Sequence, residues 1–92
     1  IGNHDNRRVP SRFTREMIDG MNMLNTLLPG TCVTYQGEEI GMEDTKVRWD
    51  QTQDIQAMNV GELLYEGYSR DPQRTPFQWN SNIHAGKLLF LV

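Results

Sequence analysis

The fold class is decided by residues 10–35, PSRFTREMIDGMNMLNTLLPGTCVTY. Apolar residues recur in this stretch at intervals of four, four, three and four, namely Phe13, Met17, Met21, Leu24 and Leu28. That spacing places them on one face of a helix. Ser11 is a candidate N-cap after Pro10, and Pro29-Gly30 is a strong stop signal. The pattern therefore predicts a helix over about residues 11–28 with one buried stripe.

A short strand is predicted directly after this helix. Residues 31–35, Thr-Cys-Val-Thr-Tyr, are β-branched and aromatic without a breaker, which is typical of a strand buried on both faces. Cys32 is accordingly expected to be a buried small hydrophobe. Before the helix, Ile1 leads into a cluster of turn-forming residues, as the last residue of another strand would. The sequence thus predicts a strand–helix–strand portion of an α/β protein.

The composition excludes several classes of protein. The chain has 92 residues, of which 37% are hydrophobic and 23% charged, and its formal net charge is -3. This balance argues against a nucleic acid or an anionic membrane surface as a partner, because both require a basic face. No apolar run approaches the roughly 18 residues of a transmembrane helix. Residues 43–87 are polar and rich in Gly and Pro, so we expect mostly connecting loop there and a piece of a larger domain.

Two polar clusters follow the predicted strands, and ligands of α/β proteins lie beyond the carboxyl ends of strands. In the first, His4 and Asp5 would together bind sugar hydroxyls, with Asp5 stabilising developing positive charge; the alternative is an Asx turn with a surface histidine. The second is Glu38-Glu39, an acid/base pair or a framework feature. Adjacent residues on an extended chain point to opposite sides, so at most one glutamate faces a ligand.

Metal and cofactor chemistry have no support in the spacing of the residues. The chain contains no H-x-x-x-H, C-x-x-C or EF-hand pattern. Nothing enforces a common geometry on the available donors, which are His4, Asp5, Glu38, Glu39 and His84. We therefore predict neither a metal nor a cofactor.

Two further groups of residues each have two interpretations. A small basic patch either pairs with carboxylates near the site or is simply solvated: Arg7, Arg8 and Arg12. Three loop aromatics either stack on sugar rings or anchor loops to the protein: Trp49, Phe77 and Trp79. The residue pattern leaves both choices open.

Three motifs in order resemble the α-glucosidases of the α-amylase superfamily, glycoside hydrolase family 13, and most closely insect maltases. They are Gly2-Asn3-His4-Asp5, then Tyr35-Gln36-Gly37-Glu38-Glu39-Ile40-Gly41-Met42, then Arg70-Asp71-Pro72-Gln73-Arg74-Thr75-Pro76-Phe77-Gln78-Trp79-Asn80. The resemblance runs from Ile1 to about Gly86. It implies part of a (β/α)8 TIM barrel: the end of strand seven at residues 3–5, helix seven at 11–28, strand eight at 31–35, and the long loop that follows. Residues 1–92 would be a fragment from the C-terminal half of one catalytic domain, with residues 87–92 departing from the family pattern.

The resemblance also implies an activity, the hydrolysis of terminal α-linked glucose from maltose-like oligosaccharides or sucrose by a retaining mechanism. Asp5 would be the carboxylate that stabilises the transition state, His4 would bind hydroxyls of the same glucose, and Arg8 would contact substrate on the leaving-group side. Glu38 and Glu39 would be framework residues. The nucleophile and the acid/base residue would precede residue 3, so we expect the chain alone to be inactive. The family implies an extracellular or cell-surface location.

A non-catalytic relative is the alternative. The barrel-type heavy chains of amino-acid transporters resemble this chain in their strand end near Glu38-Glu39 and act as partner subunits. The intact Asn3-His4-Asp5 motif argues against them, because a subunit without catalysis needs no stabilising carboxylate. Attachment to a membrane would have to come from parts outside this chain.

Overall fold

The computed structural model describes residues 1–82. The expectations for His84 and for residues 87–92 therefore concern residues outside the described range. The structure contains four short α-helices: α1 (Val9–Arg12), α2 (Ile18–Leu27), α3 (Ile55–Val60) and α4 (Tyr65–Tyr68). Four 3₁₀ turns lie between and after them: Arg15–Met17, Glu38–Ile40, Trp49–Gln51 and Asp71–Gln73. Within residues 1–82 no strand is assigned.

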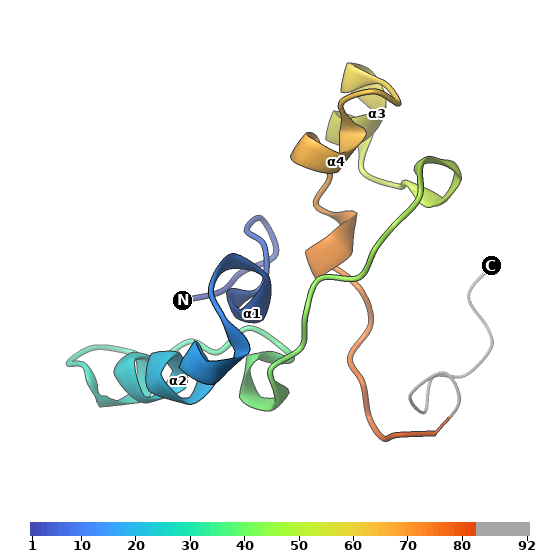
Figure 1. Ribbon diagram of the computed structural model, residues 1–92. Helices are drawn as coiled ribbons and strands as arrows, with labels where there is room; N and C mark the ends of the chain where they lie inside the picture. Colours follow the sequence, from blue (N-terminus) through green and yellow to red (C-terminus); the bar gives the residue numbers. More distant parts are fainter. Residues whose placement is uncertain (83–92) are drawn as a thin grey trace.

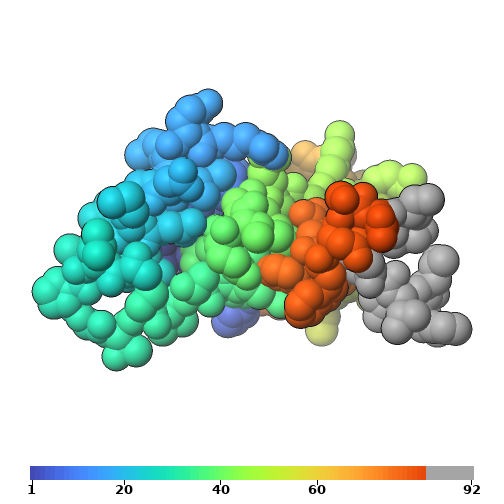
Figure 2. Space-filling model, turned by 90° about the horizontal axis from the view of Figure 1, so that it is seen from below, coloured from blue at the N-terminus to red at the C-terminus, as the bar shows by residue number. Residues whose placement is uncertain are grey.

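The helices form two groups. Figure 1 shows α1, α2 and the turn Glu38–Ile40 in one group, and α3 and α4 packed on each other in an arm above it. The segment after residue 42 runs from the first group to the second, and the turn Asp71–Gln73 lies against it. In Figure 2, α2 and the loop after it occupy one end, the green segment near residue 45 the middle, and the orange-red residues before 83 the other side. The chain is elongated, with extents of 41 × 31 × 24 Å.

The predicted continuous helix over residues 11–28 is interrupted. Phe13 and Thr14 have extended backbone angles, with ψ of -155° and 160°, and they separate α1 from the 3₁₀ turn that leads into α2. Aromatic and β-branched side chains are weak helix formers, which explains a break at this pair. Ser11 is not an N-cap: it lies within α1, and its Oγ accepts a hydrogen bond from the backbone N–H of Asp44 at 2.9 Å. The predicted end is confirmed, because α2 stops at Leu27, two residues before Pro29.

The predicted burial of the helix stripe and of the following segment is wrong in the described structure. Leu24 is 49% exposed and Val33 68% exposed, and the side chain of Cys32 is exposed as well. Residues 31–35 form no strand, because a strand requires a ladder partner and no described segment supplies one. The Nδ2 of Asn25 donates instead to the Val33 carbonyl at 3.1 Å.

Buried polar side chains are prominent in the interior of the described part. Its buried apolar residues are Val9, Met42 and Ala57. The buried polar residues are Arg8, Glu38, Thr52, Asp54 and Gln73. Because buried polar groups are stable only when they are hydrogen-bonded, their partners largely determine how the loops are held.

Gly37 is the tightest backbone position next to this interior. Its φ is 92°, and an added Cβ would meet Met42 Sδ and lie 2.8 Å from Arg8 Nη1. We expect Gly37→Ala to lower the free energy of unfolding of the full-length protein by about 2–3 kcal/mol, from left-handed strain plus overpacking. Gly67→Ala is the matched control, because it lies in α4 with nothing within 4 Å of its Cβ position. Equal denaturant midpoints for the two variants would contradict this expectation.

Candidate active site

The Asn3-His4-Asp5 loop is closed by an Asx turn. Asn3 Oδ1 accepts hydrogen bonds from the backbone N–H of Asp5 at 2.9 Å and of Asn6 at 3.0 Å. It also accepts one from the Asn6 side-chain amide at 3.0 Å. The side chains of His4 and Asp5 are 64% and 54% exposed. The predicted Asx turn with a surface histidine is thus confirmed as geometry, and it leaves both side chains exposed.

The carboxylate of Asp5 is surrounded by three cationic or polar side chains. Its Oδ1 accepts a hydrogen bond from Arg74 Nη2 at 2.7 Å and lies 3.5 Å from Arg70 Nη1. Its Oδ2 lies 3.3 Å from His4 Nε2. His4 and Asp5 were predicted to act together, and the structure brings them together. The two arginines were missed, because the sequence shows them only as parts of the Arg-Asp-Pro-Gln-Arg motif 65 or more positions away.

Arg70 is held by a second carboxylate. Asp54, whose side chain is only 2% exposed, receives Arg70 Nη2 on Oδ1 at 2.7 Å and Arg70 Nε on Oδ2 at 2.8 Å. These hydrogen bonds hold the pKa of Asp54 well below its ordinary value, although burial opposes the shift. The Asp54 carboxylate in turn raises the pKa of Arg70. Arg70 therefore presents a fixed positive charge beside Asp5.

Asp71 fastens the loop that carries both arginines. Its Oδ2 accepts the backbone N–H groups of Gln53 at 2.8 Å and Asp54 at 3.0 Å. Asp54 Oδ2 accepts the backbone N–H of Arg70 at 2.8 Å in return. The segment before α3 and the turn Asp71–Gln73 are thereby joined side by side, which fixes where the arginine side chains begin.

Arg8 lies apart from the Asp5 carboxylate. Arg8 is buried, with 2% of its surface exposed. Its Nη1 donates a hydrogen bond to the Gln36 carbonyl at 2.7 Å, and its guanidinium carbon lies 5.0 Å from the centre of the Tyr35 ring. Its backbone N–H donates to Asp44 Oδ1 at 2.9 Å. The structure thus buries Arg8 against Gln36 and Tyr35. Its contact with substrate remains a prediction.

The two glutamates occupy framework positions. Glu38 is buried, and its Oε2 accepts the backbone N–H of Tyr35 at 3.0 Å. Glu39 Oε2 accepts the backbone N–H of Gly37 at 2.9 Å. Both carboxylates therefore serve the turn on which they lie, in agreement with the framework interpretation and not with an acid/base pair.

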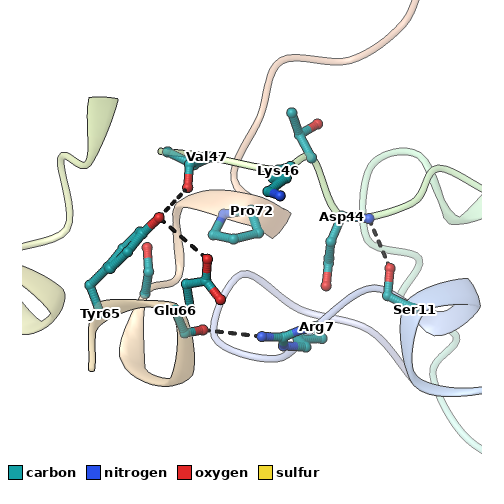
Figure 3. A pocket seen from close by; sticks show the side chains of 10 residues that line it. Arg7, Ser11, Asp44, Lys46, Val47, Tyr65, Glu66 and Pro72 are labelled. Atoms are coloured by element: carbon teal, nitrogen blue, oxygen red, sulfur yellow. Dashed lines mark hydrogen bonds between the residues drawn. The ribbon is translucent and has the colours of Figure 1, made fainter. Parts of the chain in front are cut away.

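The other two arginines of the basic patch bind backbone carbonyls. Arg12 Nη2 donates to the Ile1 carbonyl at 3.0 Å, and Arg7 Nη2 donates to the Glu66 carbonyl at 3.1 Å. Figure 3 shows Arg7 at the edge of an open pocket of about 340 Å³ between three segments of the chain. The pocket is lined by Arg7, Ser11, Asp44, Thr45, Lys46, Val47, Tyr65, Glu66, Ser69 and Pro72. Asp5 is not among them, so this pocket is separate from the carboxylate.

The loop aromatics pack in pairs. Trp49 meets Tyr65 edge to face with ring centres 5.5 Å apart, and Phe77 meets Trp79 at 4.8 Å. Trp79 is nevertheless 74% exposed. Trp49 is therefore an anchor of the loop on α4, while Trp79 retains a free face.

The described residues form neither a metal-binding cluster nor a membrane-spanning helix. No group of three or more His, Cys, Asp or Glu side chains in residues 1–82 is arranged to hold a metal ion. None of the helices described is both long enough and apolar enough to cross a membrane.

The sequence of the chain matches one family of catalytic domains over nearly its whole length. Residues 1–88 match the family described as alpha amylase, catalytic domain, and the chain belongs to this family. The match implies a (β/α)8 barrel for the domain as a whole.

Several curated glucosidases and maltases are similar to the chain. It is 48% identical to an alpha-glucosidase of Apis mellifera over 85 residues, and 48% identical to maltase A1 of Drosophila melanogaster over 86 residues. It is 49% identical to a salivary alpha-glucosidase of Anopheles gambiae over 86 residues. These matches cover 92–94% of the chain but only 14–15% of the relatives' own length. The resemblance to α-glucosidases and insect maltases drawn from the motifs is therefore confirmed, with the chain corresponding to a fragment of the domain.

Proposed function

We propose that the full-length protein containing this segment is an α-glucosidase. It removes terminal α-linked glucose from maltose-like oligosaccharides or sucrose with retention of configuration, and this segment supplies the transition-state-stabilising part of the site. The relatives reported above carry the names of glucosidases and maltases, which supports an enzyme over a transporter heavy chain. An oligosaccharide or disaccharide is then the partner of the site.

The Asp5 carboxylate is the observation that carries this proposal. Glycoside hydrolysis passes through an oxocarbenium-like state, and hydrogen bonds to the ring hydroxyls that strengthen in that state accelerate the reaction. Asp5 is accessible, and its Oδ2 is directed toward His4 Nε2, 3.3 Å away. A carboxylate acceptor and an imidazole side by side suit a pair of neighbouring sugar hydroxyls, and the negative charge suits the developing cation.

The position of this loop in the barrel is part of the proposal. Residues 3–5 lie at the end of strand seven, the helical segment that ends with α2 is helix seven, and residues 31–35 are strand eight. Active sites of such barrels lie at the carboxyl ends of the strands, where loops supply the reacting groups. The exposure of residues 31–34 in the described part fits a strand whose ladder partners belong to the rest of the barrel.

Two further assignments belong to this proposal. We propose an extracellular or cell-surface location, because similar proteins of Anopheles gambiae and Aedes aegypti are named salivary alpha-glucosidases. We also propose that Arg8 contributes to substrate binding on the leaving-group side; in the described part its guanidinium binds the Gln36 carbonyl and lies beside the Tyr35 ring.

The test is the stereochemistry of the product. The full-length protein, incubated with sucrose, whose leaving group is fructose, and followed by proton NMR, is expected to release α-glucose first, with β-glucose appearing only by mutarotation. A retaining enzyme gives this order because two successive inversions occur at the anomeric carbon. Initial release of β-glucose would contradict the retaining mechanism, and no release of glucose from maltose or sucrose would contradict the activity itself.

A further inference from the structure

We propose that the open pocket beside Arg7 is a second sugar-binding site, which takes one neutral pyranose ring away from Asp5. This inference goes beyond the proposed function, because Asp5 does not line the pocket. Its volume of about 340 Å³ lies within the usual range of small-molecule sites, about 300–1,000 Å³. Its walls come from three segments of the chain, namely the loop after Asp5, residues 44–47 and residues 65–72.

Four charged side chains surround this pocket without pairing. Arg7 and Lys46 are the cations, and Asp44 and Glu66 are the anions (Figure 3). No ion pair joins any two of them within residues 1–82. Opposite charges that remain apart around an open space keep donors and acceptors available for a ligand.

Several polar atoms of these side chains lack a partner in the described part of the chain. Asp44 Oδ2 is buried and accepts no hydrogen bond. The Glu66 carboxylate has one contact, between its Oε1 and the Tyr65 hydroxyl at 3.5 Å. Ser11 Oγ accepts the backbone N–H of Asp44 and donates to no residue within residues 1–82. Because a buried acceptor without a partner costs about 1–3 kcal/mol, a hydroxyl donor in this pocket would be stabilising.

The mixture of charges selects a neutral ligand with several hydroxyl groups. An anion would be attracted by the two cations but repelled by the two carboxylates, and the reverse holds for a cation. A hydroxyl group suits both, because it donates to a carboxylate and accepts from a guanidinium or ammonium group. Val47, Tyr65 and Pro72 add apolar surface, which suits the C–H groups of a pyranose ring.

A zwitterionic amino acid fits this arrangement less well. Its two charges lie on neighbouring groups at one end of the molecule. The charged side chains of the pocket come instead from three segments around it. Hydroxyl groups distributed around a sugar ring match such a distribution.

The experiment measures binding of D-glucose to the full-length protein by saturation-transfer difference NMR. The catalytic site is filled with saturating acarbose, an inhibitor several sugar rings long that is too large for the pocket, and the loss of sucrose hydrolysis verifies that it is filled. A glucose signal is expected to persist. Glu66→Gln and Lys46→Met are each expected to raise the Kd of this remaining site about tenfold, because each removes a charge-assisted hydrogen bond.

Glu62→Gln is the matched control. Glu62 is an exposed glutamate four residues before Glu66 and does not line the pocket. Wild-type glucose binding is expected from this control. The melting temperatures of all three variants are expected to match that of the wild type, because none of the three side chains forms an ion pair within residues 1–82.

Three outcomes would overturn this proposal. They are the absence of a glucose signal once acarbose fills the catalytic site, equal glucose affinity in all the variants, and a pocket that binds glycine but not glucose. A protein that binds glucose at the pocket but hydrolyses no α-glucoside would support the second sugar site and overturn the proposed function.

Discussion

Asp5→Asn in the full-length protein is expected to lower kcat for maltose by about 100-fold or more while the fold stays intact. Asparagine has nearly the same shape and keeps one acceptor oxygen for Arg74, so the loop has no steric reason to move. What is lost is the negative charge beside a sugar that becomes cationic in the transition state. Because that interaction is strongest in the transition state, the change appears mainly in kcat.

The matched control for this variant is Asp50→Asn. Asp50 is also an exposed aspartate paired with an arginine, with its side chain 63% exposed and its Oδ2 2.6 Å from Arg48 Nη2. It lies on the loop that precedes α3 and makes no contact with the site. We expect wild-type turnover from Asp50→Asn and unchanged circular dichroism from both variants. Near-normal hydrolysis by Asp5→Asn would refute the role of Asp5 as the stabilising carboxylate.

The core of this site is predictable from sequence because its two residues are adjacent in the chain. His4 and Asp5 need only a turn to be presented together, and Asn3 supplies that turn by a local side-chain hydrogen bond. The arginines at 70 and 74 could not be found in this way. No periodicity connects residue 5 with residue 74, and the contact depends on how the intervening loop folds back.

The helix prediction also depends only on residues close together in the chain. This explains why it located the helix and its end but not the burial of its apolar face. Intervals of three and four identified the helical face and Pro29 identified its end, since both effects act within a few residues. Burial is different, because it depends on what covers the face. Leu24 is half exposed and Cys32 is exposed since the covering elements are not among residues 1–82.

The region predicted to be mostly connection contains two short helices. Gly61 ends α3 with a φ of 83°, and α4 begins at Tyr65. The start of α3 is set by the Asp54 side chain, which accepts the backbone N–H of Gln56 at 3.1 Å. Such short helices have weak periodicity and are fixed by caps and tertiary contacts. The same aspartate, through Arg70, connects this loop to the site.

Asp54→Asn is expected to lower the free energy of unfolding of the full-length protein by about 2–3 kcal/mol at about pH 7. The Asp54 carboxylate is almost fully buried and receives Arg70 Nε, Arg70 Nη2 and two backbone N–H groups. A neutral amide has only one acceptor oxygen and cannot accept all four of these hydrogen bonds. The Arg70 guanidinium also loses its charged partner. Equilibrium denaturation measures the difference, with Asp50→Asn again as the exposed control, for which we expect no measurable change.

The pH dependence separates the charge of Asp54 from its shape. Hydrogen bonds from Arg70 lower the pKa of Asp54 in the folded protein below its unfolded value, which is about 3.9. A lowered pKa contributes stability that is present above the unfolded value and is lost as the pH falls toward the folded one. The gap between wild type and Asp54→Asn is therefore expected to be constant from about pH 7 to pH 5 and to narrow below about pH 4. A gap of equal size at about pH 3 would show that shape, and not the ion pair with Arg70, accounts for the loss.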